Sequence, residues 1–286
     1  NIYFESTGLN LGEIITTGDV WIDASASIID NNGSSNNITA ARAVILSGSS
    51  TNSMETQGGY LEVATVGFVQ VQNTGDLVIG DAGDLTGIYA RDSTIYVNTT
   101  GSLDVRESIQ TGTSLSLYAG GDITIRAGVI VKSEDSSFGV SLVADDDILV
   151  EEGAQLIALT GGVGLEAKNM VADNANIAVE LWGQTHSADG TSVYGGVNSD
   201  AFYITPSLES EISVNGLSPA TPGDTLFYNE PIDGAYLDYD SENARLDYAG
   251  GYQSIYVTGI ENLEAGFSVP DPAHLMIKGT SGDDVL

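Results

Sequence analysis

The sequence predicts an all-β fold, a parallel β-solenoid with a small C-terminal β-rich cap or spacer. Three features lead to this prediction: a short apolar alternation that recurs many times, turn-forming residues between its copies, and a regular spacing. Glycine occurs 35 times among 286 residues, and few segments show the 3.6-residue apolar period that an amphipathic helix requires. A mainly helical fold is therefore disfavoured.

The recurring unit is an apolar residue, any residue, and a second apolar residue. This alternation is typical of strands with one buried face, because successive side chains point to opposite sides of a strand. Gly, Asp, Asn and Ser fill the intervals and favour turns. The units are Val20/Ile22, Val44/Leu46, Leu61/Val63, Leu77/Ile79, Ile95/Val97, Leu103/Val105, Leu115/Leu117, Ile123/Ile125, Val140/Leu142, Ile148/Val150, Ile157/Leu159, Val163/Leu165 and Ile177/Val179.

The spacing of the units predicts how the strands stack. Ile95 to Leu115 and Leu103 to Ile123 are 20 residues each, whereas Ile123 to Val140 is 17. We expect two strands in each coil of about 17 to 20 residues, with every coil covering the apolar face of its neighbour. An antiparallel sandwich is the alternative, because its strands recur at roughly 8 to 12 residues.

Three longer stretches connect this pattern to a known class of proteins. TTGDVWIDASASI, NTGDLVIGDAGDL and AGGDITIRAGVIV resemble the right-handed β-helices of large bacterial exoproteins, including filamentous-haemagglutinin-like adhesins, over roughly residues 10 to 200. The resemblance implies a rigid extended segment that works outside the cell or on the bacterial surface.

The composition changes beyond Ser199 and suggests a division of the chain. Four of the six prolines lie between residues 205 and 231, and proline is excluded from central strands. We expect the regular stack to end or become irregular near Pro206. The expected parts are an N-terminal strand or arm (1–10), a parallel β-helix (11–205), a β-rich cap or spacer (206–270), and a linker with a first partial repeat (271–286).

The last eight residues, GTSGDDVL, resemble the glycine-rich nonapeptide of haemolysin-type (RTX) calcium repeats. The resemblance places Asp284 at the calcium-ligand position, beside Asp283, and Leu286 at the inward apolar position. It implies that the natural chain continues into calcium-binding repeats and is exported by a type I system.

The charge of the chain limits its partners. Forty acidic residues against eight Lys and Arg give a formal charge of −32. Nucleic acid and anionic lipid require a cationic surface, so neither is an expected partner. Membrane insertion is not expected, because no apolar run approaches the roughly 20 residues that a crossing needs. Cysteine is absent, which excludes disulfides and thiol chemistry within this chain.

Carboxylate-rich turns make Ca²⁺ the expected cofactor, in a structural role, because this hard cation prefers oxygen ligands. A solvated acidic turn is the alternative at each position. DYDSEN resembles the start of an EF-hand loop but lacks its later Gly and Glu. The candidate ligands within the body of the chain are Asp81, Asp84, Asp145, Asp146, Asp147, Asp238, Asp240 and Glu242.

Few residues point to catalysis, and we expect no enzymatic activity. The two histidines, His186 and His274, lie far apart in the sequence and in predicted loops. A polysaccharide lyase or hydrolase is the alternative, because many parallel β-helices have such activities. Arg106 and Arg126, one predicted coil apart and near Asp104, are the candidate bases; solvent-facing ion pairs are the competing interpretation.

The expected function is structural: a stalk, an adhesin body, or a subunit of an extracellular filament or layer. Ile2 and Phe4 alternate in the first strand and are expected to mediate assembly, by adding a strand to a neighbouring molecule. The partners would be further copies, head to tail or lateral, or other surface proteins and glycans. Four aromatic residues are expected to cover solenoid ends, with sugar binding as the alternative: Trp182, Tyr194, Tyr203 and Tyr228.

Overall fold

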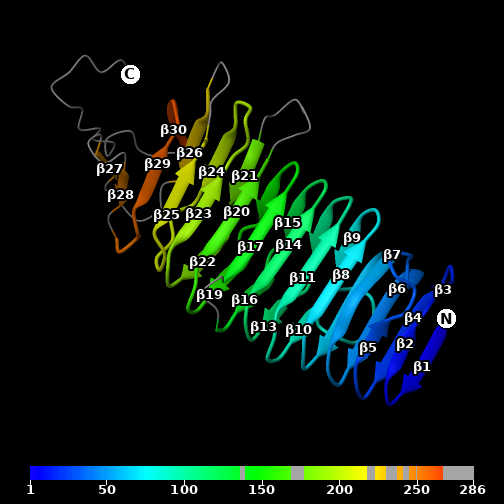
Figure 1. The fold of residues 1–286 in the computed structure, drawn as a ribbon. Coiled ribbons are helices and arrows are strands. Elements are labelled where there is room, and N and C mark those ends of the chain that lie inside the picture. Colours follow the sequence, from blue (N-terminus) through cyan, green and yellow to red (C-terminus); the bar gives the residue numbers. More distant parts are fainter. Residues whose placement is uncertain are drawn as a thin grey trace.

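The chain forms one elongated β-solenoid, described by a computed structural model (Figure 1). The structure describes residues 1–135, 139–168, 177–217, 223–229, 237–240, 245–248 and 250–266. Thirty strands and no helix occur within these ranges. Nowhere in them does the chain form a helix with the length and apolar character that a membrane crossing requires. The predicted all-β parallel solenoid is confirmed.

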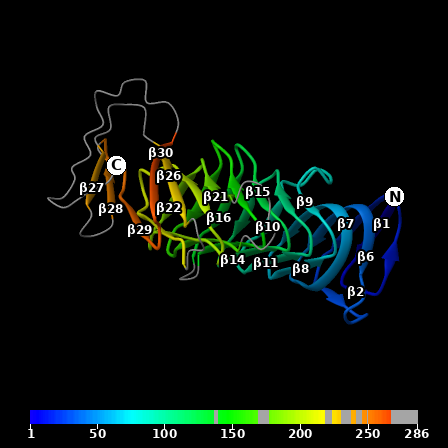
Figure 2. The ribbon, with the colours of Figure 1, turned by 90° about the horizontal axis from the view of Figure 1, so that it is seen from above.

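The strands stack into three parallel faces around a common core, and β1 and β30 lie near opposite ends of the stack (Figure 2). Face A consists of β1 (Ile2–Ser6), β4 (Asp19–Ala24), β6 (Ile38–Ser47), β7 (Thr51–Thr65), β10 (Ile88–Ala90), β13 (Ile109–Thr111), β16 (Ile130–Ser133), β19 (Gln155–Ala158) and β22 (Gln184–Ser187). Face B consists of β2 (Leu9–Leu11), β5 (Ile28–Asp30), the start of β7, β8 (Val69–Asn73), β11 (Ile95–Thr99), β14 (Leu115–Ala119), β17 (Val140–Ala144), β20 (Val163–Ala167), β23 (Thr191–Tyr194), β25 (Ile212–Asn215) and β29 (Ile255–Thr258). Face C consists of β9 (Leu77–Ile79), β12 (Leu103–Val105), β15 (Ile123–Ile125), β18 (Ile148–Val150), β21 (Ile177–Leu181), β24 (Ala201–Ile204), β26 (Thr225–Asn229) and β30 (Asn262–Gly266).

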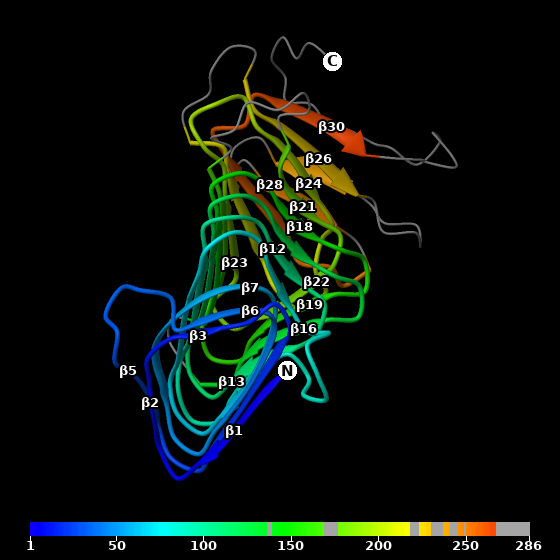
Figure 3. The same ribbon diagram turned by 90° about the vertical axis from the view of Figure 1, so that its right-hand side faces the viewer.

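Seen end-on, the backbone forms nested coils (Figure 3). The inward side chains of these coils form columns along the solenoid. One column on face B is buried to at least 94% along its whole length, so every coil shields its neighbours from water. Its members, in register from coil to coil, are Met54, Val71, Val97, Leu117, Leu142, Leu165, Val193, Val214 and Val257. Parallel pairing throughout these ladders contradicts the antiparallel sandwich.

The predicted coil length was right for one interval and wrong for another. Ile95 pairs with Leu115, one coil of 20 residues away, as expected. Ile123, however, lies on face C and pairs with Ile148, whereas Val140 lies on face B. Each regular coil therefore has three strands, and the 17-residue interval connects strands of different faces. Short strands with similar apolar pairs hide this difference in the sequence.

Two of the apolar units have the opposite orientation to the one predicted. Leu156 and Ala158 point inward on β19, whereas Ile157 and Leu159 lie on the outer surface. On β6 the inward residues are Ala43 and Ile45, not Val44 and Leu46. In both segments apolar residues occupy consecutive positions, so alternation alone does not decide which residues face the core.

Both predicted boundaries of the β-helix differ from the observed ladders. β1 is the first strand of face A, paired with β4, and does not form a separate arm. The parallel ladders also continue beyond residue 205 through β25, β26, β29 and β30. Irregularity does begin there, because the step from Ile212 to its partner Ile255 is 43 residues. Two antiparallel strands, β27 (Leu237–Asp240) and β28 (Arg245–Tyr248), pair beside β29, and β3 (Ile14–Ile15) pairs with β6.

We expect Leu117→Ala to lower the free energy of unfolding by about 2–5 kcal/mol, because it leaves a cavity in a fully buried column. Ser116→Ala, on the outer side of the same strand, should change the stability by less than about 0.5 kcal/mol. Urea denaturation followed by circular dichroism measures both. Equal effects of the two substitutions would contradict the assigned inward and outward faces.

Candidate cation site at the acidic corner

The turn from face B to face C places polar residues in a column, because the strands that follow it stack in register. Asp76, Ser102, Asp122 and Asp147 directly precede β9, β12, β15 and β18. The first apolar residues of these strands are register partners from coil to coil. We call this column, with the neighbouring turn residues, the acidic corner.

Side chains of the acidic corner connect successive coils through the backbone. The amide of Ser102 donates to Asp76 Oδ1 at 2.9 Å, and the amide of Asp122 donates to Ser102 Oγ at 3.1 Å. The amide of Asp147 lies 3.4 Å from Asp122 Oδ1. Each of these side chains therefore accepts a hydrogen bond from the equivalent position one coil further along.

Three carboxylates meet at one level of this corner. Oxygen atoms of Asp122, Asp146 and Asp147 all lie within 4.8 Å of one another. All three residues are at least partly accessible to solvent, and Asp146 and Asp147 are half-buried. Such a set of hard oxygen ligands on two adjacent coils fits a divalent cation such as Ca²⁺.

A change of residue type directly before the column explains why three carboxylates meet at this level. Gly75, Gly101 and Gly121 occupy that position in the earlier coils, and Asp146 occupies it here. A β-carbon at Gly101 would lie 2.2 Å from Asp76 Oδ1 and 2.7 Å from the amide nitrogen of Asp76. The coil that contains Asp146 thus adds a carboxylate where earlier coils have only a glycine.

The predicted Asp145–Asp147 triplet is only partly brought together. Asp145 points to Lys168, with 2.7 Å between its Oδ1 and the lysine Nζ. Asp122 takes its place in the cluster, although it was not among the predicted calcium ligands. The signal that could have identified Asp122 is the 25-residue step from Ile123 to Ile148, which stacks the preceding aspartates.

The candidate ligands Asp81 and Asp84 belong to a different arrangement. Their loop is held from inside by Glu62, whose side chain is fully buried. Glu62 accepts hydrogen bonds from the amides of Ala82, Gly83 and Leu85, each at 2.9 Å. Because the loop amides point to this internal carboxylate, Glu62 holds the loop against face A. Asp81 adopts a positive φ of 56° and forms an ion pair with an arginine of face C.

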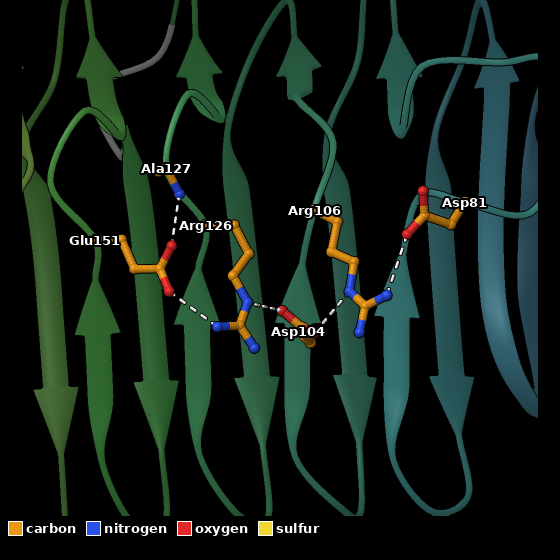
Figure 4. Close-up of polar contacts among 6 residues, drawn as sticks. All are labelled: Asp81, Asp104, Arg106, Arg126, Ala127 and Glu151. Carbon is orange, nitrogen blue, oxygen red and sulfur yellow. Dashed lines mark hydrogen bonds and ion pairs between the residues drawn. The ribbon is translucent and has the colours of Figure 1, made fainter.

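A chain of alternating charges follows the face C strands along the outer surface (Figure 4). Asp104 lies between two arginines, with 2.8 Å to Arg106 Nε and 2.7 Å to Arg126 Nε. Arg106 Nη1 also lies 3.2 Å from Asp81 Oδ2. Arg126 Nη1 lies 2.9 Å from Glu151 Oε1. The two arginines are therefore one coil apart on one face, as predicted, and each contacts two carboxylates.

These contacts work against a role for either arginine as a general base. Partial burial opposes ionisation of Asp104, but hydrogen bonds from Arg126 and Arg106 prevail and lower its pKa. Hydrogen bonds to Asp104, and then to Glu151, raise the pKa of Arg126. A lyase base must lose its proton, and these carboxylates stabilise the protonated guanidinium. The arrangement matches the ion-pair interpretation.

The aromatic residues divide between the core and the outer surface. Tyr228 is 5% exposed and belongs to the core of the C-terminal coils, between its register partners Ile204 and Ala265. Tyr203 instead stacks on Phe227 in an outer row, with ring centroids 4.5 Å apart, and Trp182 packs against Tyr203 at 5.8 Å with its ring tilted by 40°. Tyr194 is 39% exposed. Rings stacked on one another cover their faces, which a bound sugar would need.

His186 lies on β22 rather than in a loop, and forms a close contact with Glu209. It borders two shallow adjoining grooves of 420 and 220 Å³ on the outside of face A. Both grooves also share Ile157, and Gln155 and Gln184 line the smaller one. Amide and apolar side chains line much of the two grooves. Their described lining residues include no pair of carboxylates suited to catalysis.

The remaining candidates can be placed only in part. Ile2 and Phe4 lie on β1, at the first described coil. Asp238 and Asp240 lie on β27, but their side chains are outside the described part of the structure. Glu242, Asp283, Asp284 and His274 lie outside the described residues altogether.

Comparisons with known proteins show no relationship: no family model, no curated protein and no solved structure matches this chain. The resemblance to bacterial adhesins and RTX repeats therefore remains a prediction from short motifs. The three-faced parallel solenoid is shown by the ladders themselves.

We expect Glu62→Gln to lower the free energy of unfolding by about 1–3 kcal/mol, because an amide nitrogen would face a buried backbone N–H. Glu107→Gln is the comparison, since Glu107 bonds only one loop amide, that of Gly87, and is more exposed. Limited proteolysis between residues 80 and 87, alongside urea denaturation, measures the effect. A loop that stayed protected in Glu62→Gln would contradict the anchoring role.

Proposed function

We propose that this chain is a structural segment of a secreted or cell-surface bacterial protein, a stiff rod associated with calcium. It would serve as a stalk, an adhesin body or a subunit of an extracellular assembly. The observation that supports this most is the unbroken buried column from Met54 to Val257, which joins all the coils between them into one core. Coils that share a core resist bending and separation, which a spacer requires.

The charge of the surface supports a calcium-rich exterior as the working environment. The formal charge of −32 means that carboxylates along the rod repel one another. A bound divalent cation between Asp122, Asp146 and Asp147 would offset three of these charges and tie two coils together.

Calcium should stabilise the protein through this cluster. At a hundredfold excess over the dissociation constant, binding to the folded state alone adds about 2.7 kcal/mol. Thermal unfolding in Ca²⁺ and in EDTA measures the difference, and Asp147→Asn should greatly reduce it. Asp145→Asn is the matched control, because Asp145 pairs with Lys168. An equal calcium effect in the wild type and Asp147→Asn would place the calcium elsewhere.

The first described coil exposes an apolar side chain, Phe4, that a second copy could cover. Ile2 and Phe4 stack in register over Val20 and Ile22, the inward residues of the next coil. Ile22 is fully buried, whereas Phe4 is 39% exposed in the same column. The occupant that fits this end is another coil of the same fold, which would continue both the column and the backbone ladder. We therefore propose head-to-tail association of copies.

Removing residues 1–8 should abolish assembly without unfolding the chain, and Phe4→Asp should weaken assembly by placing a charge in the contact. Electron microscopy and light scattering of the native protein measure assembly. Glu5→Gln, on the outer side of β1, is the control. Filaments that persisted in both altered proteins would contradict this contact, as would native protein that remained as single rods.

A glycan-binding β-helix is the second candidate. The observation in its favour is the pair of adjoining grooves on face A, where amide side chains could bond sugar hydroxyls. Saturable binding of a soluble polysaccharide to single rods would favour this candidate over the structural role.

A further inference from the structure

The acidic corner continues into the C-terminal coils with a different pattern of hydrogen bonds. Asp200, Asp224 and Glu261 directly precede β24, β26 and β30. The amide of Asp200 donates to Asp224 Oδ1, and the amide of Asp224 donates to Glu261 Oε2, both at 2.8 Å. Asp224 and Glu261 thus each accept from the coil before, whereas the carboxylates of the earlier coils accept from the coil after. The last three coils are therefore joined by carboxylates from the C-terminal side.

Asp224 is the most deeply buried member of this column. It is 0% exposed. Its Oδ2 atom is buried and has no hydrogen-bond partner in the described part of the chain. A buried polar atom without a partner destabilises the folded chain, and a change in its protonation can remove this cost.

A glycine makes room for this oxygen. A β-carbon at Gly216 would lie 2.1 Å from Asp224 Oδ2 and 2.5 Å from the carbonyl oxygen of Gly259. The two oxygens thus face the same small space over Gly216. Two negatively polarised oxygens in such a place repel each other, unless one of them carries a proton.

The charged groups around Asp224 also favour its neutral form. Asp200, before β24, and Glu261, before β30, act on it, and both are negative. Burial, followed by these two charges, raises the pKa of Asp224 to about 6, although the hydrogen bond from the Asp200 amide opposes the shift. The buried Oδ2 atom and the negative charges around it therefore both favour a protonated Asp224.

We propose that Asp224 binds a proton in the folded chain and donates it from Oδ2 to the carbonyl oxygen of Gly259. This carboxylic acid hydrogen bond would join the coil of β26 to the coil of β30 in mildly acidic surroundings. At neutral pH the proton leaves, the two oxygens repel each other, and the contact weakens. The C-terminal end of the solenoid is then a proton-dependent latch, independent of the proposed calcium cluster and of the proposed assembly.

The direction of the pH dependence follows from the raised pKa. The folded chain holds the proton more tightly than the unfolded chain, whose carboxyl group titrates near 3.8. Stability contributed by this group is therefore present at low pH, falls as the pH rises from the unfolded to the folded value, and stays constant above it. Asp224→Asn should remove this dependence, because its amide can donate to Gly259 at every pH.

The test uses Trp182 as a local reporter. It is one of two tryptophans and packs against Tyr203 in the aromatic row of the C-terminal coils. In a Trp21→Phe background, urea unfolding is followed by the fluorescence of Trp182 from pH 4 to 8, in EDTA. We expect the midpoint of the unsubstituted background, relative to Asp224→Asn, to fall up to about pH 6 and then level off. Asp224→Asn should be the more stable protein at pH 7.5.

The matched control is Asp76→Asn, which removes an exposed carboxylate from the equivalent position of an early coil. It should leave the pH dependence of the Trp182 signal unchanged. A constant difference between Asp224→Asn and its background across the whole pH range would overturn the proposal. A calcium effect would also overturn it. If Ca²⁺ raised the urea midpoint of the background protein at pH 7.5 but left that of Asp224→Asn unchanged, a cation would occupy the place of the proton.

Discussion

In-register stacking of the inward side chains is the constraint on which the rest of this structure depends. A single coil leaves its apolar face open, and only the next coil covers it. Once Leu117 lies over Val97 and under Leu142, the backbone ladder of the whole strand is fixed with it. A shift by one residue would turn the buried set to the solvent. The apolar columns therefore set the position of every polar residue in the turns.

In the acidic corner, in-register stacking brings candidate functional side chains together. Its carboxylates stack because the strands after them stack, and no separate interaction is needed to collect them. The environment then differs along the column. Asp122, Asp146 and Asp147 are partly accessible residues whose carboxylates suit a cation, whereas the full burial of Asp224 favours a proton. In the proposals made above, one repeated position would hold two different kinds of ligand, and the proposed structural role would benefit from both.

The sequence predicted the fold class well because alternation and turn residues are local signals. It predicted the coil poorly, because the third strand on face A often lacks a clear apolar pair: Ile109 and Thr111 are inward, but only one is apolar. The cation candidates show the same limit. Asp146 and Asp147 were recognisable as a cluster of acids, whereas Asp122 joins them only through a 25-residue register. Glu62 gave no signal at all, since nothing in a sequence marks a carboxylate that holds a loop from inside.

Disulfide trapping tests the three-strand coil most directly, because the chain contains no cysteine. Thr124 and Leu149 are outer-surface register partners on face C, and neighbouring strands bring α-carbons to the distance that a disulfide spans. The account predicts that Thr124→Cys with Leu149→Cys forms an intramolecular disulfide readily under mild oxidation. Thr124→Cys with Ser141→Cys, the pair 17 residues apart, should not form one. Efficient trapping of the second pair and failure of the first would contradict the stacking described here.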